Sequence, residues 1–246
     1  MLGCRGVTST VTRQAARTAP RQAARTEPFD WRPMSENERE YWERYAKSYD
    51  RSMIVFGKPI APMLERVANA VRGRERVLEL AAGTGLVTGA IAKSARAVVA
   101  TDYAQAMVDA LAARVRDGQL DNVRCERADV YSLPYEAGTF DAVVAANVLH
   151  LLPDLPRALD AMKRVVRPGG VWVLPTYCHD ETALSWTLSR FLAITGFPGQ
   201  RRFTLPRLRD ALESAGLGVA RIERLAGPIP IGYAEGTFGE TPRPGA

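Results

Sequence analysis

The stretch Val77–Thr88 reads Val-Leu-Glu-Leu-Ala-Ala-Gly-Thr-Gly-Leu-Val-Thr, an apolar run that ends in a glycine-containing turn. The apolar run predicts a buried strand, and we expect a helix to begin near Leu86. Gly83 and Gly85 can adopt a positive φ without steric cost, and a helix N-terminus presents unpaired N–H groups to an electron-rich ligand. The pattern is that of a tight turn between strand and helix, and it predicts a ligand site at the carboxyl end of the strand.

A second apolar run, residues 97–101, ends in a carboxylate at Asp102, seventeen residues after Gly85. A carboxylate at the end of the second strand of an open α/β sheet is placed to accept both hydroxyls of a ribose. Asp102 can also cap the helix that we expect to begin near Ala104. The two roles are compatible, and together the two strand ends predict a nucleoside-binding site.

Glu79, within the first strand, distinguishes between two nucleoside cofactors. A dinucleotide needs the spacing G-x-G-x-x-G/A for its pyrophosphate, whereas the next glycine here, Gly89, stands one position too late. The Glu79 carboxylate would also repel a pyrophosphate, while it would favour a cofactor that carries a sulfonium and an amino group. The charge therefore favours S-adenosylmethionine over a dinucleotide.

Four motifs follow one another along the chain: Leu78-Glu79-Leu80-Ala81-Ala82-Gly83-Thr84-Gly85, Thr101-Asp102, Ala128-Asp129-Val130 and Phe140-Asp141-Ala142-Val143. In this order they resemble the motifs of the class I S-adenosylmethionine-dependent methyltransferases, over about residues 44–177. A turn at residues 167–170 before the fifth strand fits as well. Within that superfamily the chain is most similar to the small-molecule group that includes quinone and phospholipid methyltransferases. The resemblance implies a Rossmann-like, doubly wound α/β fold with a seven-stranded sheet, mostly parallel, whose last strand is antiparallel.

The resemblance implies that the first motif and the end of the fourth strand surround the methionine portion of the cofactor. Glu79 would orient that portion, directly or through water, and Asn147 would lie near the transferring methyl. The sequence departs from the family at Ala81, which stands where a first glycine is common and could alter how closely the methionine end packs. The residues assigned to this end are Glu79, Ala81, Gly83, Thr84, Gly85 and Asn147.

The adenosine end of the cofactor would be held by residues that follow the second and third strands. By resemblance, Asp102 holds the ribose, and Tyr103 or Met107 covers one face of the adenine. Asp129 would accept from the adenine amino group, and the Val130 N–H would face a ring nitrogen. For each of these residues a helix cap or a loop hydrogen bond is the alternative.

The chain has two histidines, His150 and His179, and each follows an expected strand. Methyl transfer depends on a near-linear approach of nucleophile to methyl carbon, so a base is needed only where the acceptor must lose a proton. His150 is a candidate general base, because its unperturbed pKa lies near neutrality; a structural hydrogen bond in its loop is the alternative. His179, beside Cys178 and Asp180, is the second candidate and a candidate for the substrate pocket.

Composition indicates one α/β domain in a chain of 246 residues, with 46% hydrophobic and 24% charged residues. Three cysteines without metal spacing predict reduced thiols and neither a zinc site nor a disulfide framework. No apolar run approaches the ~20 residues that cross a bilayer. The domain lacks a basic groove with interleaved aromatic residues, so we expect no nucleic-acid partner. We expect a cytoplasmic monomer or homodimer that acts on a small molecule, without a metal.

Residues 1–33 differ from the rest, since they hold six arginines against two acids and so supply +4 of the formal net charge of +6. We interpret them as a basic, disordered and dispensable tail, with the methyltransferase domain at residues 34–246. Arginines recurring every four residues are also typical of a mitochondrial transit peptide, which is the minority alternative. A third reading is an upstream extension absent from the mature protein, which would then begin at Met34.

Two segments are predicted to cover the site as helical lids, at about residues 36–56 and 182–200. In the first, Tyr49 belongs to a stripe of tyrosines at helical spacing and, by resemblance, lies over the active site. The second is so apolar that it must bury its surface; we expect it to roof a lipophilic substrate pocket with Trp186, and a dimer contact is the alternative. Core packing is the alternative for the tyrosine stripe.

Three further elements complete the expected fold. Residues 60–72 read as a helix before the first strand, and Thr204 caps a helix that ends at Gly216. Residues 219–225 and 229–238 are expected to form an antiparallel pair.

The function predicted from these patterns is methyl transfer from S-adenosylmethionine to a small, lipophilic acceptor at O, N or C. An NAD(P)-dependent oxidoreductase is the first alternative, disfavoured by Glu79 and by the missing third glycine. A non-catalytic protein that binds adenosylmethionine is the second, because fold alone does not determine function.

Overall fold

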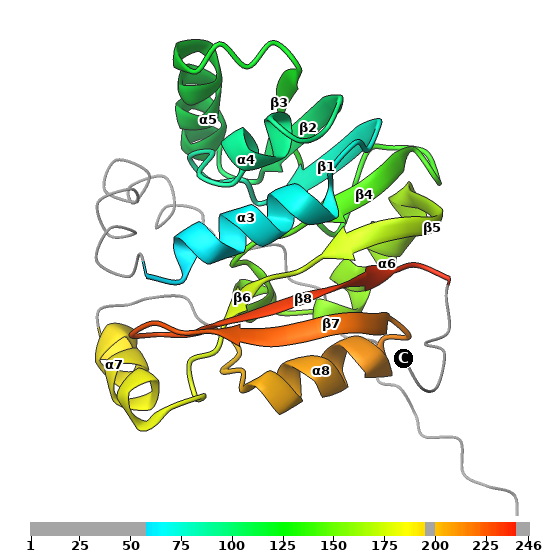
Figure 1. Cartoon of the computed structure of the whole chain (residues 1–246). Coiled ribbons are helices and arrows are strands. Elements are labelled where there is room, and N and C mark those ends of the chain that lie inside the picture. The colour runs from blue at the N-terminus through cyan, green and yellow to red at the C-terminus, as the bar shows by residue number, and fades with distance from the viewer. Residues whose placement is uncertain (1–57, 195–199, 240–246) are drawn as a thin grey trace, which may run out of the picture. The chain divides into compact units, whose positions relative to one another are not determined.

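The computed structural model describes residues 58–194 and 200–239, all of which lie in the unit formed by residues 34–246. Its framework is a sheet in which β1, β2, β3, β4 and β5 run parallel in the order β3-β2-β1-β4-β5 (Figure 1). The sheet continues through β8, which is antiparallel to β5 on one edge and to β7 on the other. The strands are β1 (Arg76–Leu80), β2 (Ala97–Asp102), β3 (Val123–Arg127), β4 (Phe140–Val144), β5 (Val166–Val173), β6 (Thr176–Tyr177), β7 (Gly218–Leu225) and β8 (Ile231–Thr237).

The sheet contains eight strand segments, where seven strands were expected. The additional segment, β6, is a continuation of β5 after an interruption at residues 174–175, because both segments pair with the same strand, β8. The doubly wound, mostly parallel fold with an antiparallel last strand is therefore confirmed. The predicted pair at 219–225 and 229–238 corresponds to β7 and β8.

The expected turn at residues 167–170 lies inside the assigned range of β5. Its pairing with β4 jumps from Phe140↔Val166 to Ala142↔Val171, so the four residues Arg-Pro-Gly-Gly bulge out of the ladder. Gly169 has a φ of +72° there, which a residue without a Cβ adopts without strain.

Helices cover both faces of the sheet, as Figure 1 shows with α3 in front and α6 behind. Each face of the sheet has its own hydrophobic core, and successive side chains of a strand point to opposite faces. Val77 belongs to the core that includes α3 and α4, while its neighbour Leu78 belongs to the core that includes α6 and α8. The helices are α3 (Ile60–Ala70), α4 (Thr88–Ala92), α5 (Gln105–Asp117), α6 (Leu155–Val165), α7 (Ala183–Ile194) and α8 (Leu205–Ser214), and η1 (Leu149–Leu151) is a single 3₁₀ turn.

The helix ends follow the local sequence closely. α4 begins at Thr88, two residues after the expected start near Leu86, because residues 84–87 form turns first. α8 begins after Thr204, whose hydroxyl accepts the Arg207 N–H at 3.4 Å, as predicted. The described helices are thus placed so that the loops following β1 to β4 meet at one edge of the sheet.

Candidate functional site

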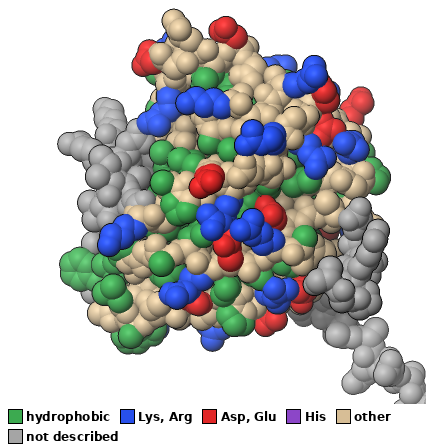
Figure 2. Space-filling model, in the orientation of Figure 1, with side chains coloured by type: hydrophobic (Ala, Val, Ile, Leu, Met, Phe, Trp, Pro, Cys, Tyr) green, Lys and Arg blue, Asp and Glu red, His purple; other side chains and the backbone are tan. Residues whose placement is uncertain are grey.

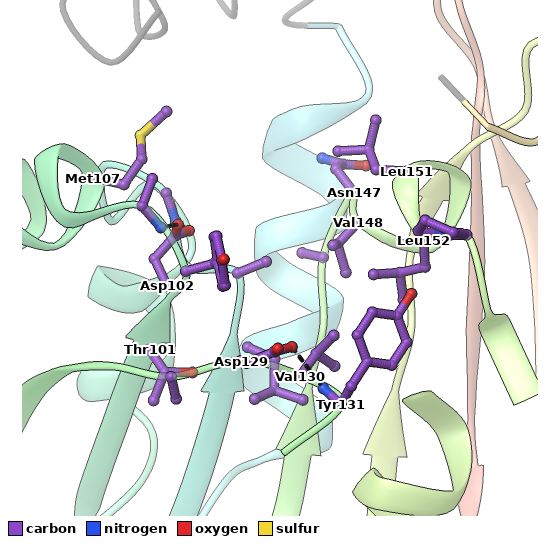
Figure 3. Close-up of a pocket in the computed structure, with 18 residues that line it drawn as sticks. Thr101, Asp102, Met107, Asp129, Val130, Tyr131, Asn147, Val148, Leu151 and Leu152 are labelled. Carbon is purple, nitrogen blue, oxygen red and sulfur yellow. Dashed lines mark hydrogen bonds between the residues drawn. The ribbon is translucent and has the colours of Figure 1, made fainter. Parts of the chain in front are cut away.

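A pocket lies at the carboxyl ends of β1, β2, β3 and β4, where the loops that follow these strands converge (Figure 3). Asp102 and Met107 approach it from one side, Asp129 and Val130 form its floor, and Asn147 faces them from beyond β4. Apolar side chains make up most of the remaining wall. The residues that line it are Leu80, Ala81, Gly83, Thr101, Asp102, Tyr103, Ala104, Met107, Ala128, Asp129, Val130, Tyr131, Ala146, Asn147, Val148, Leu151, Leu152 and Pro153.

Asp102 joins two loops of this pocket. One carboxylate oxygen accepts the Gly83 N–H at 2.9 Å, and the other accepts the Ala104 N–H at 3.0 Å. The predicted cap is therefore wrong: Ala104 is the N-cap residue of α5 and no side chain of the described residues caps the helix, while Asp102 binds the N–H of that N-cap residue. Each carboxylate oxygen can accept more than one hydrogen bond, so these two contacts orient the carboxylate and still leave capacity for a diol.

Asp129 is oriented in the same manner at the end of β3. Its Oδ1 accepts the Tyr131 N–H at 2.9 Å, the bond that is dashed in Figure 3. Tyr131 in turn fixes the next wall, because its hydroxyl accepts the Asp154 N–H at 3.1 Å. The two predicted carboxylates therefore face one pocket in conformations set by backbone donors.

The turn after β1 has left-handed backbone at three positions. Gly83 and Gly85 have φ values of +56° and +87°, as the glycine pattern predicts, and Ala81 has a φ of +51°. A Cβ on Gly85 would come within 2.7 Å of Leu111 Cδ1, so this glycine also permits α5 to pack closely. At Ala81 the same conformation places a methyl group where sterics disfavour one.

Three buried side-chain oxygens, in β1, at the start of α4 and in the loop that follows β4, have no hydrogen-bond partner among the described residues: Glu79 Oε2, Thr88 Oγ1 and Asn147 Oδ1. Burial raises the pKa of Glu79 to about 8; the Thr88 hydroxyl opposes this shift and Asp102 adds to it. Unsatisfied buried acceptors carry a free-energy cost, which a ligand with N–H donors or positive charge would relieve. The acceptor oxygens of Glu79 and Asn147 thus fit the methionine end of S-adenosylmethionine, while the carboxylates of Asp102 and Asp129 fit its adenosine.

Not every predicted residue lines the pocket. Glu79, Thr84 and Gly85 lie behind its wall, in the buried part of β1 and the turn. Trp186 is 47% exposed and its ring lies 3.8 Å from the Arg190 guanidinium, away from the lining residues. Tyr49 lies outside the described residues.

The two histidine rings lie together, with ring centroids 5.1 Å from each other, and neither is among the residues that line the pocket, although His150 precedes the lining residue Leu151. His150 is 1% exposed, and its Nδ1 lies 3.0 Å from Thr176 Oγ1. Burial, with a smaller effect from His179, places the pKa of His150 well below 6.5. His179 Nδ1 lies 2.7 Å from Ser189 Oγ, and burial lowers the pKa of His179 to about 4. Both side chains are weak bases in this environment, so their catalytic roles stay predictions.

Sequence reasoning missed several apolar lining residues, Tyr131 among them, and also Arg201, which supports the pocket from outside its lining. The backbone N–H groups of Gln200 and Arg201 both donate to the His150 carbonyl at 2.9 Å. The Arg201 guanidinium donates to the carbonyls of Leu152 and Pro153, the latter at 3.0 Å. Arg201 thereby holds the loop whose side chains close one wall, and no local pattern signals a contact across 48 positions. The neighbours Leu151 and Leu152 were detectable, since they lie in the loop and the 3₁₀ turn that follow β4.

Within residues 58–194 and 200–239, no group of three or more His, Cys, Asp or Glu side chains could hold a metal ion. No helix in these ranges has the length and apolar character needed to cross a membrane.

Comparison with known proteins agrees with this geometry. Residues 78–174 match a family model described as a methyltransferase domain. Curated relatives include a demethylmenaquinone methyltransferase from Clavibacter sepedonicus, 38% identical over 96 residues, which are 39% of this chain and 38% of the relative. A malonyl-[acyl-carrier protein] O-methyltransferase from Halorhodospira halophila is 33% identical over 141 residues, 56% of this chain and 47% of the relative. The chain spans less than half the length of each of these relatives.

Solved structures share the fold. A methyltransferase from Aquifex aeolicus described as dependent on S-adenosylmethionine has a TM-score of 0.62 at 21% identity, over 78% of this chain and 97% of that chain. The cyclase SpnF, a [4+2]-cyclase, has a TM-score of 0.56 at 24% identity, over 67% of this chain and 59% of that chain. The motif order, the sheet order 3-2-1-4-5 and the family match lead to one conclusion: residues 78–174 of this chain form a methyltransferase domain of the class I S-adenosylmethionine-dependent type.

Proposed function

We propose that this protein transfers the methyl group of S-adenosylmethionine to a small, lipophilic acceptor. The single observation that carries the proposal is the pairing of two backbone-oriented carboxylates, Asp102 and Asp129, across a pocket whose other walls are mostly apolar. The similarity to a demethylmenaquinone methyltransferase supports a lipophilic acceptor. The family match does not support the oxidoreductase alternative.

The residues of the chain contribute binding, orientation and exclusion of water. Asp102 and Asp129 would hold the ribose and the adenine amino group, while Glu79 and Asn147 would offer acceptor oxygens to the methionine end. S-adenosylmethionine supplies, when bound, an electrophilic methyl group on a sulfonium. Apolar neighbours such as Leu151 and Leu152 would keep water from the acceptor. A fixed, near-linear arrangement of the two reactants supplies much of the acceleration in such a reaction.

The first test is calorimetry of the full chain with S-adenosylmethionine, S-adenosylhomocysteine and NAD⁺. We expect binding of the first two ligands and none of NAD⁺. Asp102→Ala should weaken cofactor binding by about 1–3 kcal/mol, because a charged acceptor is lost. Asp109→Asn is the matched control, since Asp109 lies on the exposed side of α5, where its Oδ1 accepts the Gln105 side-chain N–H at 2.9 Å. Equal affinity of Asp102→Ala and the unsubstituted protein would overturn the ribose assignment.

Binding alone does not establish transfer, because a [4+2]-cyclase has the same fold. The second test therefore follows the labelled methyl group of S-adenosylmethionine into lipophilic acceptors such as a detergent-dispersed naphthoquinol or phenol, with a polar amine for comparison. We expect label in a lipophilic product and its loss in Asp102→Ala. Cofactor binding with no transfer to any acceptor class would favour the non-catalytic alternative.

A further inference from the structure

α7 has an inverted arrangement of polar and apolar side chains. Its inner face carries Ser185 and Ser189, which are 0% and 5% exposed. Its outer face carries Leu184 and Phe191 near one edge, 64% and 65% exposed, and Trp186, 47% exposed, on the opposite flank beside Arg190. These are the three large hydrophobic side chains recorded as exposed in the described part of the chain. We name them the α7 patch.

Hydrogen bonds show that this orientation is built into the helix. Ser185 exchanges hydrogen bonds with Thr182, including a capping bond from the Ser185 N–H to Thr182 Oγ1 at 3.0 Å. Ser189 donates to the Ser185 carbonyl at 2.6 Å and lies 2.7 Å from His179 Nδ1. The bonds between Ser185 and Thr182 and between Ser189 and Ser185 are local to α7, whereas the contacts of Ser189 with His179 connect α7 to the residues after β6. Rotation of α7 to bury the α7 patch would break these contacts with His179 and expose Ser185 and Ser189.

The surface beside the α7 patch is cationic. Residues 179–209 hold five arginines against two acids, a net charge of +3. Both acids are turned to local partners: Asp180 lies by Arg190 and Arg207, and Glu181 accepts the Leu205 N–H at 2.7 Å. The Asp180 side chain is only 18% exposed, whereas those of Arg190 and Arg207 are 43% and 67% exposed. Arg190 and Arg207 therefore present positive charge to solvent beside the α7 patch, while farther along α8 Arg209 is paired with Glu213 and Asp210 is exposed.

The position of α7 relates the patch to the site. α7 follows β6, at the same carboxyl end of the sheet as the pocket, and Figure 1 shows it where β7 passes into β8. In the same orientation, Figure 2 shows hydrophobic side chains gathered at that edge of the molecule. None of the residues that line the pocket belongs to α7, and that this segment roofs the substrate pocket stays a prediction.

We propose that α7 docks the protein onto an anionic lipid surface, with Leu184, Trp186 and Phe191 entering the interface and arginines contacting the headgroups. The inference rests on the proposed function, since a lipophilic acceptor resides in a bilayer. Exposed Leu, Phe and Trp beside arginine are the composition of interfacial helices, and an exposed apolar patch of this kind marks an interaction site. A symmetric dimer through the α7 patch is less favourable, because it would bring two surfaces of +3 together.

The test is cosedimentation of the full chain with vesicles of phosphatidylcholine, with and without phosphatidylglycerol. We expect binding to the anionic vesicles and at least about tenfold weaker partitioning for the double variant Leu184→Gln/Phe191→Gln. Thr187→Gln is the matched control, because it places the same side chain on the outer face of α7 without removing a large apolar group. It should change partitioning by less than about twofold.

Charge is tested separately. Arg207→Gln should weaken binding to anionic vesicles alone, and Arg124→Gln, a 79% exposed arginine on the opposite edge strand β3, should not. Residues 1–33 carry +4 and can bind anionic lipid themselves, so only differences between variants count. Equal partitioning of the double variant and the unsubstituted protein would overturn the proposal. So would a shift of the double variant from dimer to monomer in vesicle-free sedimentation, which would assign the α7 patch to self-association. Neither readout requires methyl transfer, so failure here is distinct from failure of the proposed function.

Discussion

Replacing Glu79 by glutamine should remove most of a pH-dependent loss of stability that the buried carboxyl causes. The folded protein holds this proton with a pKa of about 8, against 4.5 for the ordinary group. Between these values the folded state binds a proton that the unfolded chain has released, so stability falls as pH rises. At about 1.4 kcal/mol per unit, the loss amounts to roughly 3–4 kcal/mol from about pH 5 to about pH 8.

The assay is urea unfolding of Glu79→Gln and of the unsubstituted protein at several pH values across that range. The quantity of interest is the difference in free energy of unfolding between the two proteins, which should move in favour of the variant as pH rises. The buried histidines have lowered pKa values and act in the opposite sense below 6.5, but they are present in both proteins and cancel in the difference. Glu213→Gln, an exposed change on α8, is the control and should show no such trend.

A difference that stays constant within about 1 kcal/mol across the range would refute the reasoning. It would mean that Glu79 is ionised in the folded protein and that its carboxylate has acquired partners beyond those of the described residues. A difference moving the other way would mean that the folded state stabilises the carboxylate.

Further predictions concern the ligand, the strained turn and the wall of the pocket. Because a cationic ligand favours ionised Glu79, binding of S-adenosylmethionine should release a proton. Its affinity in calorimetry should therefore rise by up to about tenfold per pH unit from about pH 6 to about pH 8. An affinity that does not change with pH would show that Glu79 does not interact with the ligand. Ala81→Gly should stabilise the protein by about 0.5–1 kcal/mol, since relief of the left-handed strain exceeds the cost of the greater entropy that glycine gives the unfolded chain. Ala82→Gly, where φ is not positive, is the control and should destabilise the protein. Equal shifts of the thermal midpoint in the two variants would contradict the strain at Ala81. Arg201→Met should lower stability by about 1–2 kcal/mol and weaken cofactor binding, with partial recovery in Arg201→Lys; unaltered binding would show that Arg201 does not position the wall.

Much of the fold and of the pocket was predictable because the signals are local. The alternation of Val77 and Leu78 between two cores, the glycine turn and the capping Thr204 each involve residues within a few positions of one another. Asp102 and Asp129 were predicted to meet because parallel strands end at one edge of a sheet. Their meeting in one pocket follows from that topology.

Long-range contacts determined the rest. The structure has eight strand segments where seven strands were expected, because β5 and β6 are separate segments that both pair with β8. No local sequence pattern marks the interruption between β5 and β6. The apolar character of α7 predicted burial, but Ser185 and Ser189 are satisfied inside through His179 and Thr182, so the apolar face lies outward. Similarly, the pKa of His150 depends on its burial beside His179, from a different strand end.

The sequence by itself determined which segments become strands and helices, their order in the sheet, and the edge at which the ligand-binding side chains gather, because these depend on periodicity, turn chemistry and chain direction. Only the tertiary structure decided which side chains line the pocket, that Arg201 holds its wall, and which face of α7 meets solvent. The physical reason is that burial, desolvation and hydrogen-bond satisfaction depend on neighbours brought together from distant parts of the chain.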